Sequence, residues 1–303
     1  MRNTLRHQTR IFSLFFLGFI FLFVTDSLAV PTTTEYGVIL NLSGKQRMLT
    51  QKMSKQVVLI ALQFETDANL DKLMATSDLF AKTLKGLRNG DTELKLPVTT
   101  NKAILEKLTE VDKLWLEFQP TIQMIIANKN VTKDQLARIA SLNIPLLLEM
   151  NNCVKLYEKD SYKSGIISDP DLAVTINLAG KQRMLTQKMS KEFFLIAYGY
   201  EVDNNKANLR QTYLLFDKTL KGLLDGDSTL HLTGAKSPTI YRQLKLVKKL
   251  WTPFMEITSQ ATYPTTITIS NEHAEVIADS NIPLLKQMNK VVVMYEHQAN
   301  EQY

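Results

Sequence analysis

The chain has 303 residues, a length that suits two domains of ordinary size better than one. Hydrophobic residues make up 45% of the chain and charged residues 22%, with only 11 Gly and 9 Pro, which excludes a largely disordered protein and favours a helix-rich globular one. The net charge of +6 is too small to indicate a nucleic-acid-binding protein.

The first predicted element is a secretory signal peptide over residues 1–29. Three arginines precede an apolar run over residues 11–24, and small residues at positions 27 and 29 suit cleavage after Ala29. The run is short for a membrane span, and an uncleaved N-terminal anchor extending to Val30 is the alternative. We therefore expect an exported, periplasmic protein whose mature chain is soluble.

The rest of the chain is predicted to contain two copies of one unit. Residues 41–56 (NLSGKQRMLTQKMSKQ) recur as residues 177–192 (NLAGKQRMLTQKMSKE) at an offset of 136, and residues 143–158 match residues 281–296 at an offset of 138. The first segment keeps 14 of 16 residues, whereas the next twenty keep only 8. This uneven divergence indicates that the first segment carries a specific constraint.

Each copy, residues 30–165 and residues 166–303, is predicted to fold as a four-helix bundle. In the first copy the hydrophobic periodicity predicts helices over residues 36–65, 69–89 and 100–127 and a fourth from residue 132. Strand patterns are nearly absent, so the expected fold class is all-α, with two tandem four-helix bundles joined at residues 164–170.

Local signals support these helices. Gly90 is a suitable C-terminal cap for the second helix, and Thr132 with Gln135 fits a capping box for the fourth. Pro145 recurs as Pro283, which predicts a repeated kink in the fourth helix. We assign the side chains of Cys153, Trp115 and Trp251 to the core and not to a ligand site.

The first helix of each copy has two distinct faces. Apolar residues form one stripe that is expected to face the bundle core: Leu42, Leu49, Met53, Val57, Ile60 and Phe64. The opposite face, which we call the second seam, combines small and polar residues in a heptad-like order: Gly44, Arg47, Gln51, Ser54 and Val58. In the second copy the second seam consists of Gly180, Arg183, Gln187, Ser190 and Phe194.

The charges of the second seam predict an anion site. A glycine in a helix costs about 1 kcal/mol relative to alanine, so Gly44 and Gly180 suggest that another backbone approaches closely. Pairing two such basic helices brings like charges together, and an oxyanion between Arg47 and Arg183 would remove the repulsion. The candidate ligand-binding residues are Arg47, Arg183, Lys52, Lys188, Gly44, Gly180, Gln51 and Gln187. The two helices could pair within one chain, as a pseudo-dimer, or between two chains, as a homodimer.

The segment Asn-Leu-Ala-Gly-Lys-Gln-Arg-Met-Leu-Thr-Gln-Lys at residues 177–188 resembles the signature of the PilJ-type domain. That domain is the sensory N-terminal part of type IV pili methyl-accepting chemotaxis transducers and is similar to the periplasmic sensor of nitrate/nitrite histidine kinases. The resemblance implies a helical bundle that pairs through its first helix and holds a small anion such as nitrate or nitrite. Lys52 and Lys188 stand where the family's motif typically ends in Arg.

The resemblance also implies a role in signal transduction. Because the family's transducers continue beyond this domain and the sequence ends at Tyr303, we expect a binding component that reports to a separate membrane receptor.

Other functional classes are less well supported. His231, His273 and His297 have no counterparts in the other copy and no ligand-like spacing, so we expect no metal and no cofactor, and no enzymatic activity. The alternative to an anion sensor is a helical protein-interaction module that binds a partner and no small ligand. An enclosed pocket between the two arginines would favour the sensor, whereas an open seam would favour the interaction module.

Overall fold

The structure is a computed structural model that describes residues 31–163, 170–266 and 268–301. The expected signal peptide and most of the expected junction lie outside the described residues. The first copy contains α1 (Thr33–Ala61), α2 (Thr66–Asn89), β1 (Gly90–Asp91), β2 (Leu96–Val98), α3 (Lys102–Asn128) and α4 (Lys133–Lys163). The second contains α5 (Pro170–Tyr198), α6 (Val202–Asp225), the 3-10 helix η1 (Ser228–Leu230), α7 (Pro238–Ala261) and α8 (Asn271–Glu301).

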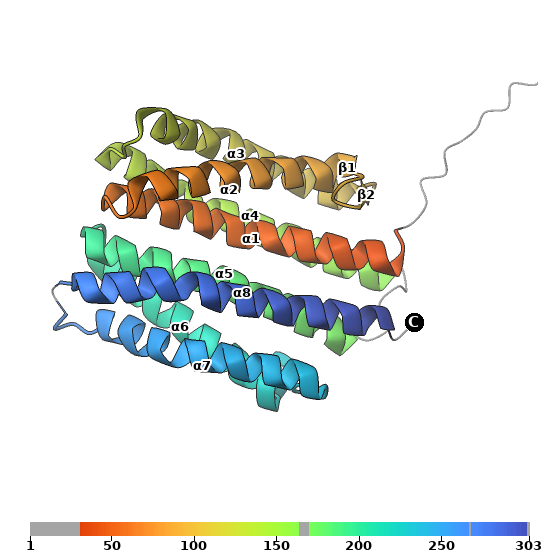
Figure 1. The fold of residues 1–303 in the computed structure, drawn as a ribbon. Coiled ribbons are helices and arrows are strands. Elements are labelled where there is room, and N and C mark those ends of the chain that lie inside the picture. Colours follow the sequence, from red (N-terminus) through yellow and green to blue (C-terminus); the bar gives the residue numbers. More distant parts are fainter. Residues whose placement is uncertain (1–30, 164–169, 267, 302–303) are drawn as a thin grey trace, which may run out of the picture.

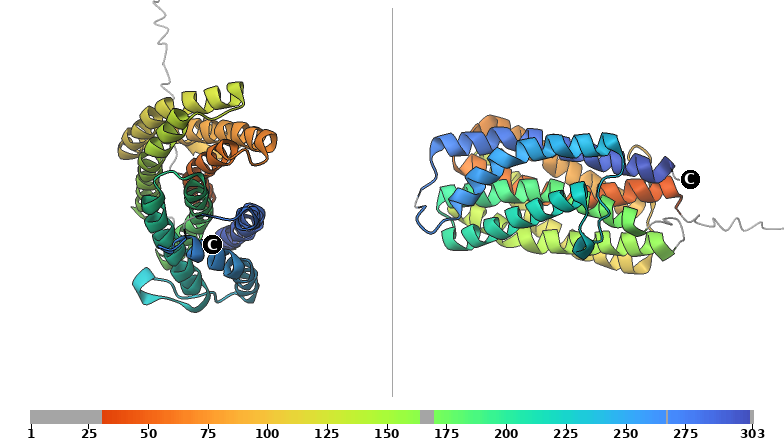
Figure 2. Two further views of the ribbon diagram at one scale, coloured as in Figure 1. Left: turned by 90° about the vertical axis from the view of Figure 1, so that its left-hand side faces the viewer. Right: turned by 90° about the horizontal axis from the view of Figure 1, so that it is seen from below.

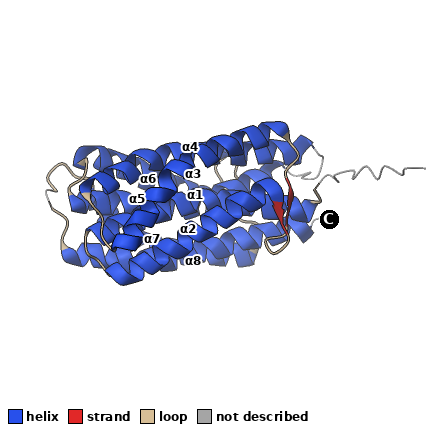
Figure 3. Ribbon diagram, turned by 90° about the horizontal axis from the view of Figure 1, so that it is seen from above, coloured by secondary structure: helices blue, strands red, loops and turns tan. Residues whose placement is uncertain are grey.

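The helices pack as two four-helix groups, α1–α4 and α5–α8, which confirms the predicted all-α fold class (Figures 1 and 3). The only described strands form a two-stranded antiparallel pair after α2, with Asp91 opposite Leu96. No helix in the described ranges is long and apolar enough to cross a membrane. The domain boundaries at residue 165 stay a prediction, because residues 164–169 are not described.

Helices α1 and α5 lie side by side at the centre of the molecule and run in the same direction (Figures 1 and 2). They make the most extensive contact between any two elements of the described chain, and each also packs against helices of its own group. The two copies therefore pair within the chain, and their equivalent residues meet across the α1–α5 interface. The start of α1, the end of α4, the start of α5 and the end of α8 share one end of the molecule.

Most of the predicted core stripe is buried. Leu49, Met53 and Val57 are at most 1% exposed, whereas Leu42 and Phe64, at the two ends of the stripe, are only partly buried. Trp115 and Trp251 occupy equivalent core positions, where each ring lies against two phenylalanines of its own copy. Both tryptophans are thus core anchors, as the sequence indicates.

The helix ends show which local signals were informative. Thr132 and Gln135 form the predicted capping box, since each side chain accepts a hydrogen bond from the other residue's backbone N–H. The first helix ends at Ala61, four residues before the predicted end, because Gln63 and Glu65 adopt positive φ angles in a tight connection to α2. Phe64 continues the apolar pattern through this turn and still packs on the core.

Gly90 ends α2 in a backbone conformation that side chains rarely adopt, with φ of 77° and ψ of 157°. A Cβ atom there would also lie 3.2 Å from the carbonyl oxygen of Leu96. Gly90→Ala is therefore expected to lower the free energy of unfolding by about 1 to 3 kcal/mol, measured by urea denaturation. Gly37→Ala is the matched control, because no atom of the described residues lies within 4 Å of the position that a Cβ would take. Alanine in a helix stabilises the protein by up to about 1 kcal/mol relative to glycine. Equal stability of the two variants would contradict this account of the α2 cap.

Candidate ligand site between the two copies

The second seam of each copy is buried against the other copy. Arg47 and Arg183 are each 2% exposed, and Gln51 and Gln187 are fully buried. Over this stretch the core stripe of α1 faces its own bundle and the second seam faces α5, while Lys45 and Lys52 remain partly exposed. The seam is an enclosed interface and not an open surface.

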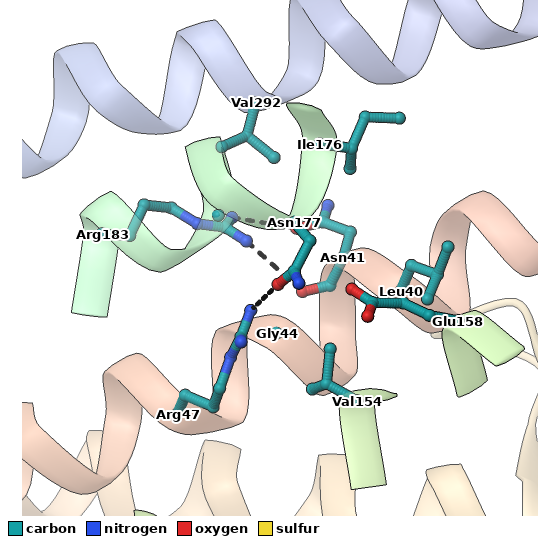
Figure 4. A pocket seen from close by; sticks show the side chains of 11 residues that line it. Leu40, Asn41, Gly44, Arg47, Val154, Glu158, Ile176, Asn177, Arg183 and Val292 are labelled. Atoms are coloured by element: carbon teal, nitrogen blue, oxygen red, sulfur yellow. Dashed lines mark hydrogen bonds between the residues drawn. The ribbon is translucent and has the colours of Figure 1, made fainter. Parts of the chain in front are cut away.

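A small cavity lies in this interface, near the end of the molecule where α1 and α5 begin (Figure 4). Its volume is about 10 Å³, enough for about one water molecule. Both arginines and both glycines of the predicted site line it. The full lining consists of Leu40, Asn41, Gly44, Arg47, Val154, Glu158, Ile176, Asn177, Gly180, Arg183 and Val292.

The two guanidinium groups converge above the two glycines. A Cβ atom on Gly44 would lie 3.3 Å from Nη2 of Arg47 and 3.8 Å from Nη2 of Arg183. On Gly180 the same distances are 3.5 Å to Nη2 of Arg183 and 3.9 Å to Nη2 of Arg47. The glycines therefore leave the space that both guanidinium groups occupy.

Each arginine is held by one asparagine from each copy. Arg47 donates from Nη1 to Asn151 Oδ1 at 2.9 Å and from Nη2 to Asn177 Oδ1 at 2.8 Å. Arg183 binds the equivalent residues, but it donates from Nη1 to both Asn289 Oδ1 and Asn41 Oδ1, each at 2.9 Å. The buried Nε of each arginine has no hydrogen-bond partner in the described chain. The two arginines thus keep two buried N–H donors for which the described residues provide no acceptor.

Burial lowers the pKa values of the basic side chains at the interface. Burial lowers the pKa of Arg47 to about 10, partly offset by Glu158 and reinforced by Arg183, and lowers that of Arg183 to about 10 as well. Lys45 and Lys181 lie nearby, and burial together with the arginine of the other copy lowers the pKa of each. Both guanidinium groups remain cationic at neutral pH.

Two carboxyl groups, Glu158 on α4 and Glu296 on α8, stand close to the arginines. Burial raises the pKa of Glu158 to about 7, against the opposing effects of Arg47, of Lys155 and of a hydrogen bond with Asn177. Burial raises the pKa of Glu296 to about 7 against the effect of Arg183. Burial thus favours the neutral form of both carboxyl groups, while the arginines favour the charged form.

The other predicted site residues lie away from the cavity. Gln51 and Gln187 are deeper in the interface, where Gln51 donates to Thr50 Oγ1 and Gln187 donates to Asn281 Oδ1. Lys188 contacts Glu192 and Thr212 instead of the α1–α5 interface. Lys52 does not line the cavity either, and the pKa of its amine is lowered by burial and by neighbouring lysines.

A second polar layer, which sequence reasoning missed, crosses the interface further along α1 and α5. Lys55 donates to Asn281 Oδ1 of the other copy at 2.7 Å, and Lys191 donates to Asn143 Oδ1 at 2.9 Å. The asparagines of this layer and of the cavity, together with both glutamates, are identical in the two copies at the repeat offsets, which is the signal that could have identified them. No cluster of metal-ligating side chains occurs among the described residues.

Comparison with known proteins agrees with this geometry. The family described as Type IV pili methyl-accepting chemotaxis transducer N-term, PilJ, matches residues 35–142 and residues 170–276, one segment in each copy. No curated protein matches the chain. The two matched segments span most of the sequence and include both arginines and both glycines of the cavity. The chain therefore belongs to the PilJ family, a sensory and non-catalytic family of chemotaxis transducer domains, and carries two tandem copies of the domain.

Proposed function

We propose that this protein is an exported sensor that binds one small anion, such as nitrate or nitrite, between α1 and α5. The observation that carries the proposal is the convergence of the Arg47 and Arg183 guanidinium groups on one enclosed cavity. A buried charge costs several kcal/mol unless it is paired. An oxyanion shared by the two arginines would pair both at once and would also supply an acceptor for each unused Nε.

The cavity must enlarge to take such a ligand. It has room for about one water molecule, whereas nitrate has four non-hydrogen atoms. The side chains that occupy the space are the amides of Asn41 and Asn177, which accept hydrogen bonds from the arginines. We expect the anion to replace these amide oxygens, so that binding shifts α1 and α5 relative to each other.

This coupling suits a sensor. Because the site is built from both copies, ligand binding and the packing of the copies favour each other by the same free energy. Helices α1 and α5 begin, and helices α4 and α8 end, at the end of the molecule nearest the site. A shift there would alter the surface presented to a separate receptor, which is the proposed signalling partner.

The alternative, a protein-interaction module without a small ligand, requires the second seam to be available to a partner. The seam is covered by the other copy, and its arginines are 2% exposed. The enclosed geometry therefore favours a small ligand over a partner helix.

The test is a thermal-shift screen of the mature protein against nitrate, nitrite and small carboxylates, followed by calorimetry. A ligand at a hundred times its Kd is expected to stabilise the protein by about 2.7 kcal/mol. Because both arginines serve one cavity, the stoichiometry should be one anion per chain, with no change in oligomeric state by light scattering. Two equal sites per chain would refute the composite site, and no response to any of these anions would refute the proposed function.

A further inference from the structure

Each cavity asparagine stands between an arginine and a glutamate. Asn41 accepts from Arg183 at 2.9 Å and donates from Nδ2 to Glu296 Oε2 at 3.2 Å. Asn177 accepts from Arg47 at 2.8 Å and is hydrogen-bonded to Glu158. The carboxylates therefore reach the arginines through an amide, and no direct ion pair joins them in the described chain.

Each glutamate has one carboxyl oxygen that could carry a proton. The Oε1 atoms of Glu158 and Glu296 are buried and make no hydrogen bond within the described residues. The charged groups that face Glu158 are Arg47 on α1 and Lys155 on its own helix, and the group that faces Glu296 is Arg183 on α5. Protonation of either carboxyl group removes a negative charge from beside the cavity.

The balance of charges in the site limits the charge of the ligand that it can take. With both glutamates ionised, the two buried arginines and the two buried carboxylates sum to zero. The amines of Lys45, Lys181 and Lys155 lie near this group but are partly or fully exposed, so solvent screens their charges. A singly charged anion restores this balance if one glutamate takes up a proton, whereas a doubly charged anion needs a proton on each. Because uncompensated charge is costly in a buried site, each added negative charge is expected to enter with a proton.

We propose that Glu158 and Glu296 determine the charge of the ligand, so that the site takes a singly charged oxyanion in preference to a doubly charged one and takes up a proton as it binds. This inference rests on the proposed anion-binding function. The glutamates act through Asn41 and Asn177 and are positioning residues that need not touch the anion.

Nitrate and sulfate are the probes, since nitrate is singly and sulfate doubly charged across the pH range used. If binding requires at least one protonated glutamate, nitrate affinity is expected to fall about fivefold from pH 6 to pH 8. Close to one proton should enter per nitrate at pH 8, measured by calorimetry in two amine buffers of different ionisation enthalpy with the same counter-ion. This measurement uses the wild-type protein and depends on no variant.

The double variant Glu158→Gln/Glu296→Gln mimics two permanently protonated glutamates. Its nitrate affinity should be the same at pH 6 and pH 8, and its sulfate affinity at pH 8 should rise about 100-fold over the wild type. Glu106→Gln, on the exposed face of α3, is the matched control and should behave as the wild type does. If the double variant fails to fold, the two single variants are measured in the same way and each should reduce the pH dependence.

Three results distinguish failure of this inference from failure of the proposed function. Nitrate binding with equal affinity at pH 6 and pH 8, without proton uptake, would overturn the inference and leave the proposed anion site standing. A pH dependence that persists in the double variant would overturn it as well. Absence of any anion binding would remove both the inference and the proposed function.

Discussion

Lys55→Met is expected to stabilise the protein strongly at pH 6 and to remove much of the rise in stability that we expect for the wild type between pH 7 and pH 10. Lys55 is 6% exposed, and its amine donates to Asn281 Oδ1 across the α1–α5 interface. Burial, together with the nearby charges of Lys52 and Lys72, lowers the pKa of Lys55 to about 7. Lys191 repeats this arrangement, and burial lowers its pKa to about 8 despite the opposing charge of Glu192.

The direction of the effect follows from proton binding. The folded protein holds the Lys55 proton less tightly than the unfolded chain, so between pH 7 and the ordinary lysine value of 10.5 the unfolded chain binds more protons. Wild-type stability therefore rises with pH across that window, and below about pH 7 the full cost of the buried charge remains. That cost is on the order of 3 to 5 kcal/mol, which methionine avoids because it fills a similar volume without charge.

Urea denaturation of the wild type and of Lys55→Met at pH 6, 8 and 9.5 measures this effect. The variant leaves Asn281 Oδ1 with the hydrogen bond from Gln187, so no acceptor loses all its donors. Lys102→Met is the matched control, because the Lys102 side chain is 92% exposed and its loss should change stability little at any pH. If Lys55→Met is less stable than the wild type at pH 6, the amine contributes more through its hydrogen bond than its burial costs, and our account of this layer is wrong.

Either Arg47→Met or Arg183→Met is expected to abolish the proposed anion response. Charge-assisted hydrogen bonds contribute about 1.5 to 3 kcal/mol each, so loss of one two-pronged guanidinium should weaken anion binding by about 100-fold or more. Because both arginines line one cavity, each single variant should lose the response as fully as the double variant does. Methionine keeps the apolar part of the side chain and limits the loss of packing.

Calorimetry with nitrate on the two single variants and the double variant tests this prediction. Arg138→Met is the control, because Arg138 lies on α4, its side chain is 53% exposed, and it forms a surface ion pair with Glu117. Circular dichroism of each variant checks that the helices remain. Full nitrate affinity in one single variant would show that the arginines serve separate sites or that only one of them binds the ligand.

Much of the fold was accessible from the sequence. The repeated segments established two copies, and the periodicity of the first helix identified both its core stripe and a second packing face. The four candidate residues that line the cavity, Arg47, Arg183, Gly44 and Gly180, were all on that second face. The helix end at Ala61 was not accessible, because Phe64 continues the apolar period while the backbone already turns.

The choice between pairing within a chain and pairing between chains was also not accessible. Periodicity reports which face of a helix is apolar, small or charged, but it does not report which distant helix covers that face. In the structure the covering helix is α5 of the same chain, which runs in the same direction as α1 and brings equivalent residues to one level.

The sequence by itself thus determined the duplication, the helical class and the residue types of the second face, because these depend on local order along the chain. Tertiary structure decided which polar groups meet there. Arg47 is bound by Asn151 and Asn177, which lie 104 and 130 residues away along the chain, and Glu158 approaches through one of them. Contacts across such separations depend on how whole helices pack, so no local pattern along the chain specifies them.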